Sequence, residues 1–189
     1  MMIHYFLLFC KSYYIVNFAA NPALCQWEFV RDFFKECQGA GFHTALDTTA
    51  YCLWENIEQV LKYTDLILFD IKHMDSARHE EKTGVSNELI LENLDKASKM
   101  TKIWLRIPLI PGFNDSESNM QKTAELALRT GVEKISLLPY HEWGKDKYSS
   151  LGKQYGYDGA DGILEPDSDV VERCRMILES HGLEVGIGK

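Results

Sequence analysis

Short apolar, β-branched runs alternate along this chain with longer stretches in which apolar residues recur at helical spacing. Runs of about four to eight such residues, bounded by turn residues, are typical of buried strands. The alternation therefore predicts strands that are separated by helices. The expected strands cover residues 15–18, 43–46, 65–70, 102–107, 134–138 and, near the end of the chain, 183–187.

The longer stretches predict helices with a buried face. Phe29, Phe33 and Phe34 recur at helical spacing in the first of them, and we expect all three rings in the core. Ser86 is expected to cap the start of the third helix. Gly131 is expected to end the fourth, because glycine readily adopts the left-handed backbone found after helices. The predicted helices cover residues 26–38, 53–62, 87–100, 117–129 and 168–181.

The order of these elements defines the expected fold class. Strand and helix alternate with a repeat of roughly 25–35 residues, which indicates βαβ units and a parallel sheet. Parallel connections are right-handed, and a series of such units curves toward a barrel. We therefore expect an α/β fold, a partial (β/α) barrel of parallel strands. The length of 189 residues suits one domain with a substantial core.

Composition and charge narrow the classes of protein. The formal charge is −8 and no basic stripe offsets it, which argues against a nucleic-acid binder. The apolar residues 1–10 are too few to span a bilayer and lack the features of a signal peptide, so we expect no membrane association. The cysteines are odd in number and widely spaced, which indicates a reducing compartment, and we expect a cytoplasmic protein.

Polar residues gather at the ends of the predicted strands. Ligands of parallel α/β folds bind there because the loops converge. Such groups are either strand-end caps with a local ion pair, or a site for a ligand that carries both a carboxylate and a cationic centre. In the second case, we expect the charged groups and the imidazole around one cavity. The residues are Asp47, Thr48, Asp70, Lys72, Arg106 and His141.

A second group of residues resembles a metal-binding set. It consists of His73, His79 and Glu80. A metal site requires side chains that converge on one point, and no helical spacing places these three on one face. We therefore expect them to be solvated.

Several strand-end segments together resemble those of the glycyl-radical-enzyme activating enzymes, the radical S-adenosylmethionine family typified by pyruvate formate-lyase activating enzyme. The resemblance covers the chain from about Phe29 to the C-terminus, and the segment from Leu137 to Lys147 is its most specific part. The matching segments are Leu46-Asp47-Thr48, Phe69-Asp70-Ile71-Lys72, Trp104-Leu105-Arg106, Ile110-Pro111-Gly112 and Leu137-Leu138-Pro139-Tyr140-His141-Glu142-Trp143-Gly144-Lys145.

The resemblance implies a role for each strand-end residue. Lys72 would face the methionine carboxylate of S-adenosylmethionine, and His141 would contact its nucleoside. Asp47, Thr48 and Asp70 would lie near the methionyl group and hold a monovalent cation there. Arg106 matches the family's strand-end arginine. The implied partners are a glycyl-radical enzyme, such as a pyruvate formate-lyase, and a reducing flavodoxin or ferredoxin.

The chain also departs from the family pattern. The family's CxxxCxxC loop, whose three thiolates hold a [4Fe–4S] cluster, does not occur in this sequence. The family's Gly-Gly-Glu-Pro is replaced by residues 19–22, Ala-Ala-Asn-Pro, whose methyl groups obstruct close backbone approach to a cofactor. We therefore expect residues 1–25 to be a divergent or truncated segment. Residues 26–189 would be the C-terminal portion of a barrel that lacks its first βα unit.

These departures set the functional expectation. The parent enzyme would generate a glycyl radical on its partner, whereas this chain alone would hold no iron–sulfur cluster, bind S-adenosylmethionine weakly or not at all, and be inactive. The alternative is a non-catalytic half-barrel that docks on a partner or binds a nucleoside. A third, weaker alternative is an unrelated barrel enzyme with Asp70 and Lys72 as acid and base.

Overall fold

The computed structural model describes residues 5–6, 9–10, 13–19, 21–132, 134–140 and 164–188, with side chains from residue 24 onward. The strands are β1 (Tyr5–Phe6), β2 (Phe9–Cys10), β3 (Tyr13–Ala19), β4 (His43–Thr48), β5 (Leu66–Asp70), β6 (Lys102–Leu109), β7 (Lys134–Pro139) and β8 (Val185–Ile187). The helices are η1 (Asn21–Gln26), α1 (Trp27–Gly39), α2 (Trp54–Leu61), α3 (Ser76–Thr83), α4 (Glu88–Ala97), α5 (Glu117–Thr130) and α7 (Asp169–Glu179).

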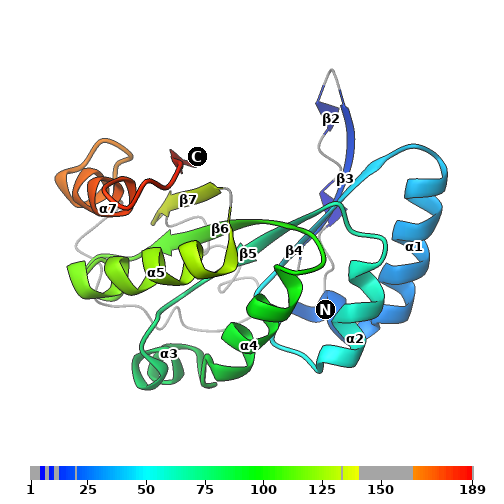
Figure 1. The fold of residues 1–189 in the computed structure, drawn as a ribbon, viewed down its shortest axis with the longest axis horizontal. Coiled ribbons are helices and arrows are strands. Elements are labelled where there is room, and N and C mark those ends of the chain that lie inside the picture. Colours follow the sequence, from blue (N-terminus) through cyan, green and yellow to red (C-terminus); the bar gives the residue numbers. More distant parts are fainter. Residues whose placement is uncertain are drawn as a thin grey trace, which may run out of the picture.

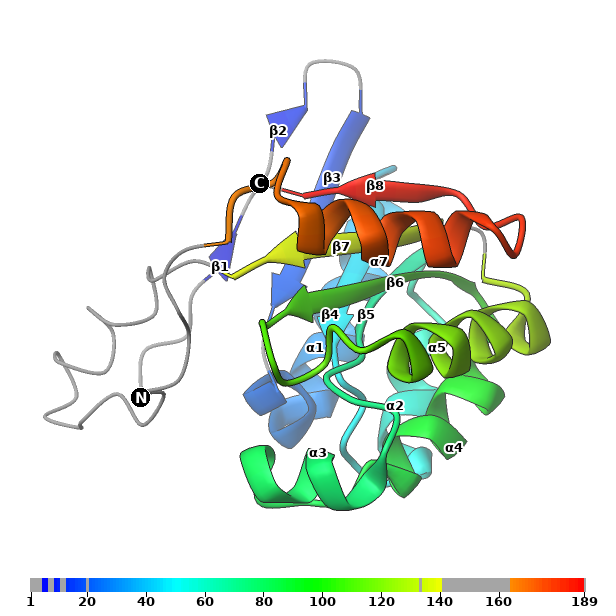
Figure 2. The same cartoon turned by 90° about the vertical axis from the view of Figure 1, so that its left-hand side faces the viewer.

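The strands form one curved sheet in the order β1-β3-β4-β5-β6-β7-β8. Every pairing from β3 through β8 is parallel, and each of these strands lies beside the next one in the sequence. Helices α1, α2, α4 and α5 form an arc outside the strands (Figure 1), and a quarter turn shows α7 packed alongside β7 and β8 (Figure 2). The predicted α/β fold and partial barrel are confirmed.

The burial pattern shows which face of the sheet meets the helices. Along β5 and β6 every second residue is buried, which is the period expected of a strand with two different faces. Ile67, Phe69 and Leu105 belong to the buried set and pack in the main core. Asp70 and Arg106 fall on the other positions, so they face the inner side of the curved sheet.

Most predicted elements agree with the structure within a few residues, but their ends correct several details. Ser116 caps α5 and Gly131 ends it with a φ of 65°, as predicted for the glycine. Ser86 does not cap α4, because that helix begins after Asn87. Phe34 is buried, whereas Phe29 is 49% exposed, so the helix buries a narrower face than its aromatic residues indicated.

Some elements were not predicted. The short strands β1 and β2 pair antiparallel with β3. Helix α3 was also missed, although its sequence carries signals at both ends. Asp75 accepts a hydrogen bond from the backbone N–H of Arg78, and Gly84 follows the helix with a φ of 82°. Its low content of apolar residues hid it from a search for hydrophobic periodicity.

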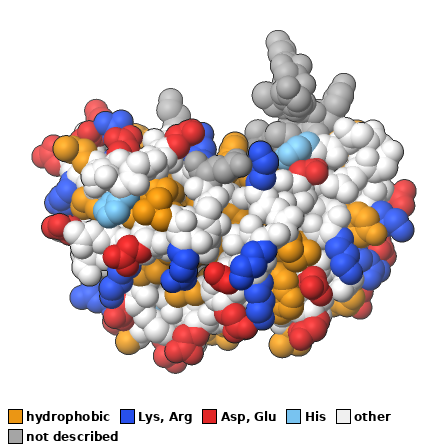
Figure 3. Space-filling view, viewed as in Figure 1, with side chains coloured by type: hydrophobic (Ala, Val, Ile, Leu, Met, Phe, Trp, Pro, Cys, Tyr) orange, Lys and Arg blue, Asp and Glu red, His pale blue; other side chains and the backbone are white. Residues whose placement is uncertain are grey.

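The surface carries charged side chains of both signs. Acidic and basic side chains are interspersed over the face drawn in Figure 3, without a continuous basic stripe there. Within the described residues, no helix is long and apolar enough to cross a membrane.

Candidate functional site

The register of the sheet brings three charged side chains together on its inner face. Asp70, the last residue of β5, lies directly beside Arg106 of β6. Asp47 of β4 is paired with Leu68, two residues before Asp70 on the same face. The three side chains therefore form a row across adjacent parallel strands near their carboxyl ends.

Arg106 joins the two carboxylates. Its Nε donates to Asp70 Oδ1 at 2.9 Å, and its Nη2 lies 2.8 Å from the same oxygen. Nη2 also donates to Asp47 Oδ1 at 2.5 Å. The guanidinium presents several donors in one plane, so it holds both carboxylates in a fixed relation, which a lysine would not do as well.

Lys72 completes the cluster from the loop after β5. Its Nζ lies 2.8 Å from Asp70 Oδ2, so Asp70 receives one cation on each oxygen. The Lys72 side chain is 30% exposed and that of Asp70 is 15% exposed, which makes the ammonium the more accessible charge. We call Asp47, Asp70, Lys72 and Arg106 the charged cluster.

Burial changes the acidity of one member of the charged cluster. The pKa of Asp47 is raised to about 6, chiefly because burial disfavours the carboxylate. The neighbouring charge of Asp70 raises this pKa further, while Arg106 and Lys72 lower it. Asp47 therefore changes its charge close to neutral pH, and the balance of charge in the cluster changes with it.

Thr48 is held away from this cluster. It follows Asp47 on β4, so its side chain points to the opposite face of the sheet, and it is buried. Its hydroxyl accepts a hydrogen bond from the backbone N–H of Ala50 at 2.9 Å, within a turn where Ala50 has a positive φ of 55°. The structure therefore does not bring the Thr48 hydroxyl to the carboxylates of Asp47 and Asp70.

His141 lies outside the described residues, so its predicted place beside the charged cluster stays a prediction. Tyr140 precedes it and is the last residue that the structure describes before residue 164. The same holds for most of the segment from Leu137 to Lys147 that carried the most specific part of the resemblance.

The expectation that His73 and His79 are solvated is wrong. Both imidazoles are buried: His73, on the loop before α3, packs against the ring of Phe113, and His79 lies on the buried face of α3 itself. His73 Nδ1 accepts from the backbone N–H of Asp75 at 2.8 Å, and His79 Nδ1 lies 2.8 Å from the carbonyl oxygen of Val85. Glu80 is exposed as predicted. In the part of the chain with described side chains, no three His, Cys, Asp or Glu residues converge on a metal position.

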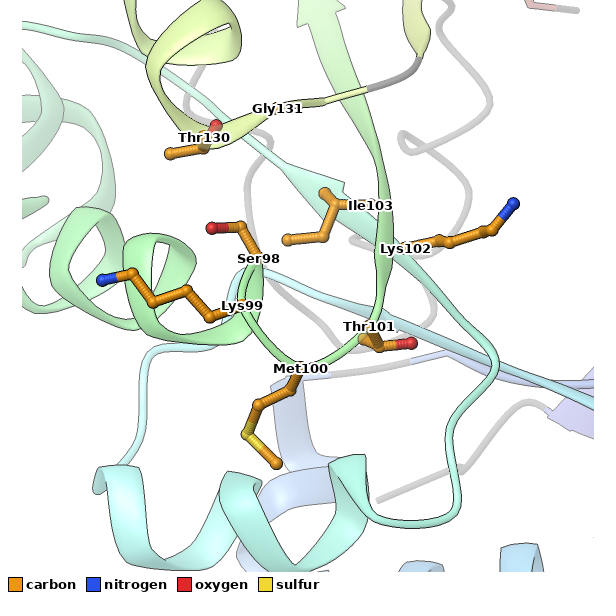
Figure 4. Close-up of a pocket in the computed structure, with 8 residues that line it drawn as sticks. All are labelled: Ser98, Lys99, Met100, Thr101, Lys102, Ile103, Thr130 and Gly131. Atoms are coloured by element: carbon orange, nitrogen blue, oxygen red, sulfur yellow. The ribbon is translucent and has the colours of Figure 1, made fainter.

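A hollow of about 340 Å³ lies at the amino-terminal end of β6, opposite the carboxyl ends of the strands (Figure 4). Its lining consists of residues that follow α4, begin β6 and end α5, among them Lys99, Met100 and Thr130. Since ligands of parallel α/β sheets bind at the carboxyl ends of the strands, this hollow does not belong to the charged cluster.

Asparagine side chains near the charged cluster are the residues that sequence reasoning missed. Asn114 and Asn119 are buried, and both hydrogen-bond to the main chain of the loop that carries Lys72. The place of Asn114 directly after Pro111-Gly112-Phe113 marks a turn, but no sequence signal indicates which distant carbonyl its amide reaches.

Comparison with known proteins defines the class and then the family. The family model described as Radical SAM superfamily matches residues 9–127. Pyruvate formate-lyase 1-activating enzyme of Escherichia coli (strain K12) is 38% identical over 174 residues, which are 90% of this chain and 70% of that protein. The 4-hydroxyphenylacetate decarboxylase activating enzyme of Clostridioides difficile (strain CD196) is 34% identical, over 92% of this chain and 55% of that protein.

A solved structure supports the same relation. A domain of pyruvate-formate lyase-activating enzyme from Bacteroides vulgatus superposes with a TM-score of 0.75 at 33% identity, covering 92% of this chain and 98% of that one. The chain therefore belongs to the Radical SAM superfamily and, within it, to the family of glycyl-radical-enzyme activating enzymes.

The family implies two cofactors, and the described residues fit one of them. The amino-acid end of S-adenosylmethionine carries a carboxylate and an ammonium, which suit the accessible Lys72 ammonium and the carboxylates beside it. A [4Fe–4S] cluster requires several thiolates that converge. The described free cysteines, Cys25, Cys37, Cys52 and Cys174, lie on separate elements and do not fit it.

Proposed function

We propose that this chain is the S-adenosylmethionine-binding portion of an activating enzyme that generates a glycyl radical on a partner such as pyruvate formate-lyase. The observation that carries the proposal is the charged cluster, a paired set of two carboxylates and two cations near the carboxyl ends of β4, β5 and β6. When bound, S-adenosylmethionine supplies the radical chemistry by which this family removes a hydrogen atom from a glycine of the partner.

Within this proposal, Lys72 binds the carboxylate of the methionyl group. Its ammonium is compact, its side chain is partly exposed, and Asp70 Oδ2 contacts the ammonium at 2.8 Å. Charge-assisted hydrogen bonds of this kind are among the stronger polar contacts in proteins. Arg106 keeps Asp70 and Asp47 in place, so that the cationic groups of the ligand meet carboxylates that are already oriented.

We also propose that Asp47 and Asp70 hold a monovalent cation beside the methionyl group. Carboxylate oxygens are suitable ligands for a hard cation. Because the Thr48 hydroxyl faces the other side of β4, Thr48 takes part through its main chain in this proposal. His141 keeps its expected role at the nucleoside.

The chain alone is proposed to be inactive, because no CxxxCxxC occurs in its sequence. We further propose a reducing flavodoxin or ferredoxin as electron donor and a cytoplasmic location. The free thiols of Cys25, Cys37, Cys52 and Cys174 support a reducing compartment.

Ligand-observed NMR with S-adenosylmethionine tests the binding role. We expect a dissociation constant no tighter than about 1 mM, because losing each charge-assisted contact that a cluster or a glutamate would supply costs about 1.5–3 kcal/mol. Lys72→Ala should weaken this binding by about tenfold, because one charge-assisted contact worth about 1.5 kcal/mol is lost. Lys99→Ala removes an exposed ammonium at the opposite end of the sheet and should leave binding unchanged. Equal binding by wild type and Lys72→Ala would contradict the proposal, and binding of 5′-methylthioadenosine alone would favour the nucleoside-binding alternative.

A further inference from the structure

The loop that carries Lys72 is held by side chains from other parts of the chain. We define the 71–75 loop as the connection between β5 and α3. Its first residue, Ile71, still pairs with β6, because its N–H donates to the carbonyl oxygen of Arg106 at 2.9 Å. Beyond Ile71, buried asparagines hold main-chain groups of three consecutive residues, Lys72, His73 and Met74.

Asn114 is the centre of this arrangement. Its side chain is fully buried, and its Nδ2 donates both to the carbonyl oxygen of Lys72 at 2.9 Å and to that of Pro108 at 2.8 Å. Its Oδ1 accepts from the N–H of Ile110 at 2.8 Å. One amide therefore ties the end of β5 to the end of β6, and only a side chain with donors and an acceptor at these positions makes all three bonds.

Asn119 and Asn87 extend the arrangement along the loop. Asn119, in the first turn of α5, accepts from the N–H of Met74 at 2.9 Å and donates to the carbonyl oxygen of Asn114 at 2.8 Å. Asn87, just before α4, donates to the carbonyl oxygen of His73 at 2.9 Å. Residues 72–74 are thus fixed from two directions, by the β6–α5 connection and by the start of α4.

This arrangement bears directly on the charged cluster. The main chain at Lys72 sets where its side chain begins, and the ammonium at its other end lies 2.8 Å from Asp70 Oδ2. A small shift of the main chain under a long, flexible side chain costs little stability. The same shift weakens a directed contact between that side chain and a ligand. The carbonyl held by Asn114 belongs to the same residue whose side chain carries the charge.

We propose that Asn114, supported by Asn119, is a positioning residue for S-adenosylmethionine binding, because it fixes the 71–75 loop and thereby directs the Lys72 ammonium to the carboxylate of the ligand. The inference rests on the proposed function, which assigns that carboxylate to Lys72. It adds residues that do not touch the ligand and that act through the main chain of Lys72.

Two measurements on Asn114→Ala test the inference. Hydrogen exchange without ligand should become at least tenfold faster in the 71–75 loop. The affinity for S-adenosylmethionine should fall threefold to tenfold, whereas the affinity for 5′-methylthioadenosine, which lacks the amino-acid end, should stay the same. In a Lys72→Ala background, adding Asn114→Ala should cause no further loss.

Asn93→Ala is the matched control for stability. Asn93 is also fully buried, and its Nδ2 also donates to two carbonyl oxygens, those of Ala50 and Cys52 in the β4–α2 loop. It should lower the melting temperature about as much as Asn114→Ala does, without speeding exchange in the 71–75 loop.

The possible outcomes separate the two proposals. Wild-type protein that binds no S-adenosylmethionine overturns the proposed function and this inference with it. If the wild type binds, any one of three results overturns the positioning role alone. Asn114→Ala could lose affinity equally for both ligands, its loss of affinity could add to that of Lys72→Ala, or it could leave hydrogen exchange in the 71–75 loop unchanged.

Discussion

Asp70 receives Arg106 on one carboxylate oxygen and Lys72 on the other, at 2.8 Å in both cases. The first contact comes from the parallel register of β5 and β6, and the second from the loop that leaves β5. Asp70 therefore joins the rigid part of the charged cluster, on the strands, to its accessible part, on the loop.

Asp70→Asn should destabilise the fold and disorder the charged cluster. The amide oxygen cannot balance two cations, so Arg106 and Lys72 would lose their shared counter-charge. We expect the free energy of unfolding to fall by about 1–3 kcal/mol, the cost of leaving partly buried charged groups without a partner. Denaturant unfolding measures the loss. Asp32→Asn removes the exposed ion pair with Arg31 and should not shift the midpoint.

The pH dependence of stability should report Asp47. Its pKa is raised from 3.8 to about 6 by burial, so the folded protein binds this proton more tightly than the unfolded chain does. The stability that Asp47 contributes is thus fully present below about pH 4 and is lost as the pH rises to about 6. Unfolding titrations should show wild type losing stability relative to Asp47→Asn across this range. A difference that changes in the opposite direction would mean that pairing with Arg106 outweighs burial.

Reconstitution with iron and sulfide under anaerobic conditions should give no stoichiometric [4Fe–4S] absorbance or paramagnetic signal. The reason is the spacing of the cysteines, since no three of them share a loop in this sequence. Cys25→Ala serves as the comparison, because Cys25 is the exposed thiol among the described cysteines. A signal near one cluster per chain that disappears in Cys25→Ala would contradict this prediction.

Gly131→Ala should lower the free energy of unfolding by about 1 kcal/mol. Gly131 ends α5 with a φ of 65°, and a Cβ at this position would meet no atom within 4 Å, so the cost comes from the backbone conformation alone. Gly39→Ala is the matched control. It lies in the last turn of α1, also has open space for a Cβ, and is not among the glycines with positive φ. It should be neutral or slightly stabilising. Equal losses in the two variants would rule out the conformational explanation.

Local patterns in the sequence were enough to predict the parallel strands and most helices. The parallel α/β architecture follows from the alternation of those elements, because few topologies satisfy right-handed connections. The strand-end positions of Asp47, Asp70 and Lys72 were also readable, since a strand of known direction places its last residues at one edge of the sheet. Arg106 instead lies within β6, which continues to Leu109.

The predictions that failed depend on packing between distant segments. His73 and His79 were expected to be solvated, yet both are buried, and α3, which carries His79, lacks the apolar periodicity that reveals most helices. Phe29 fits the helical spacing of apolar residues in α1, yet its side chain is largely exposed. Its burial depends on how much of that helix face the rest of the chain covers.

The sequence by itself therefore determined which residues stand at the strand ends, because strand period and direction are local properties. Only the tertiary structure decided which of them meet. The register of β4, β5 and β6 places Arg106 between two carboxylates. The hydrogen bond from Asn114 to Lys72 joins residues 42 positions apart. A contact across such a separation depends on how complete elements pack, and no local pattern in the sequence encodes it.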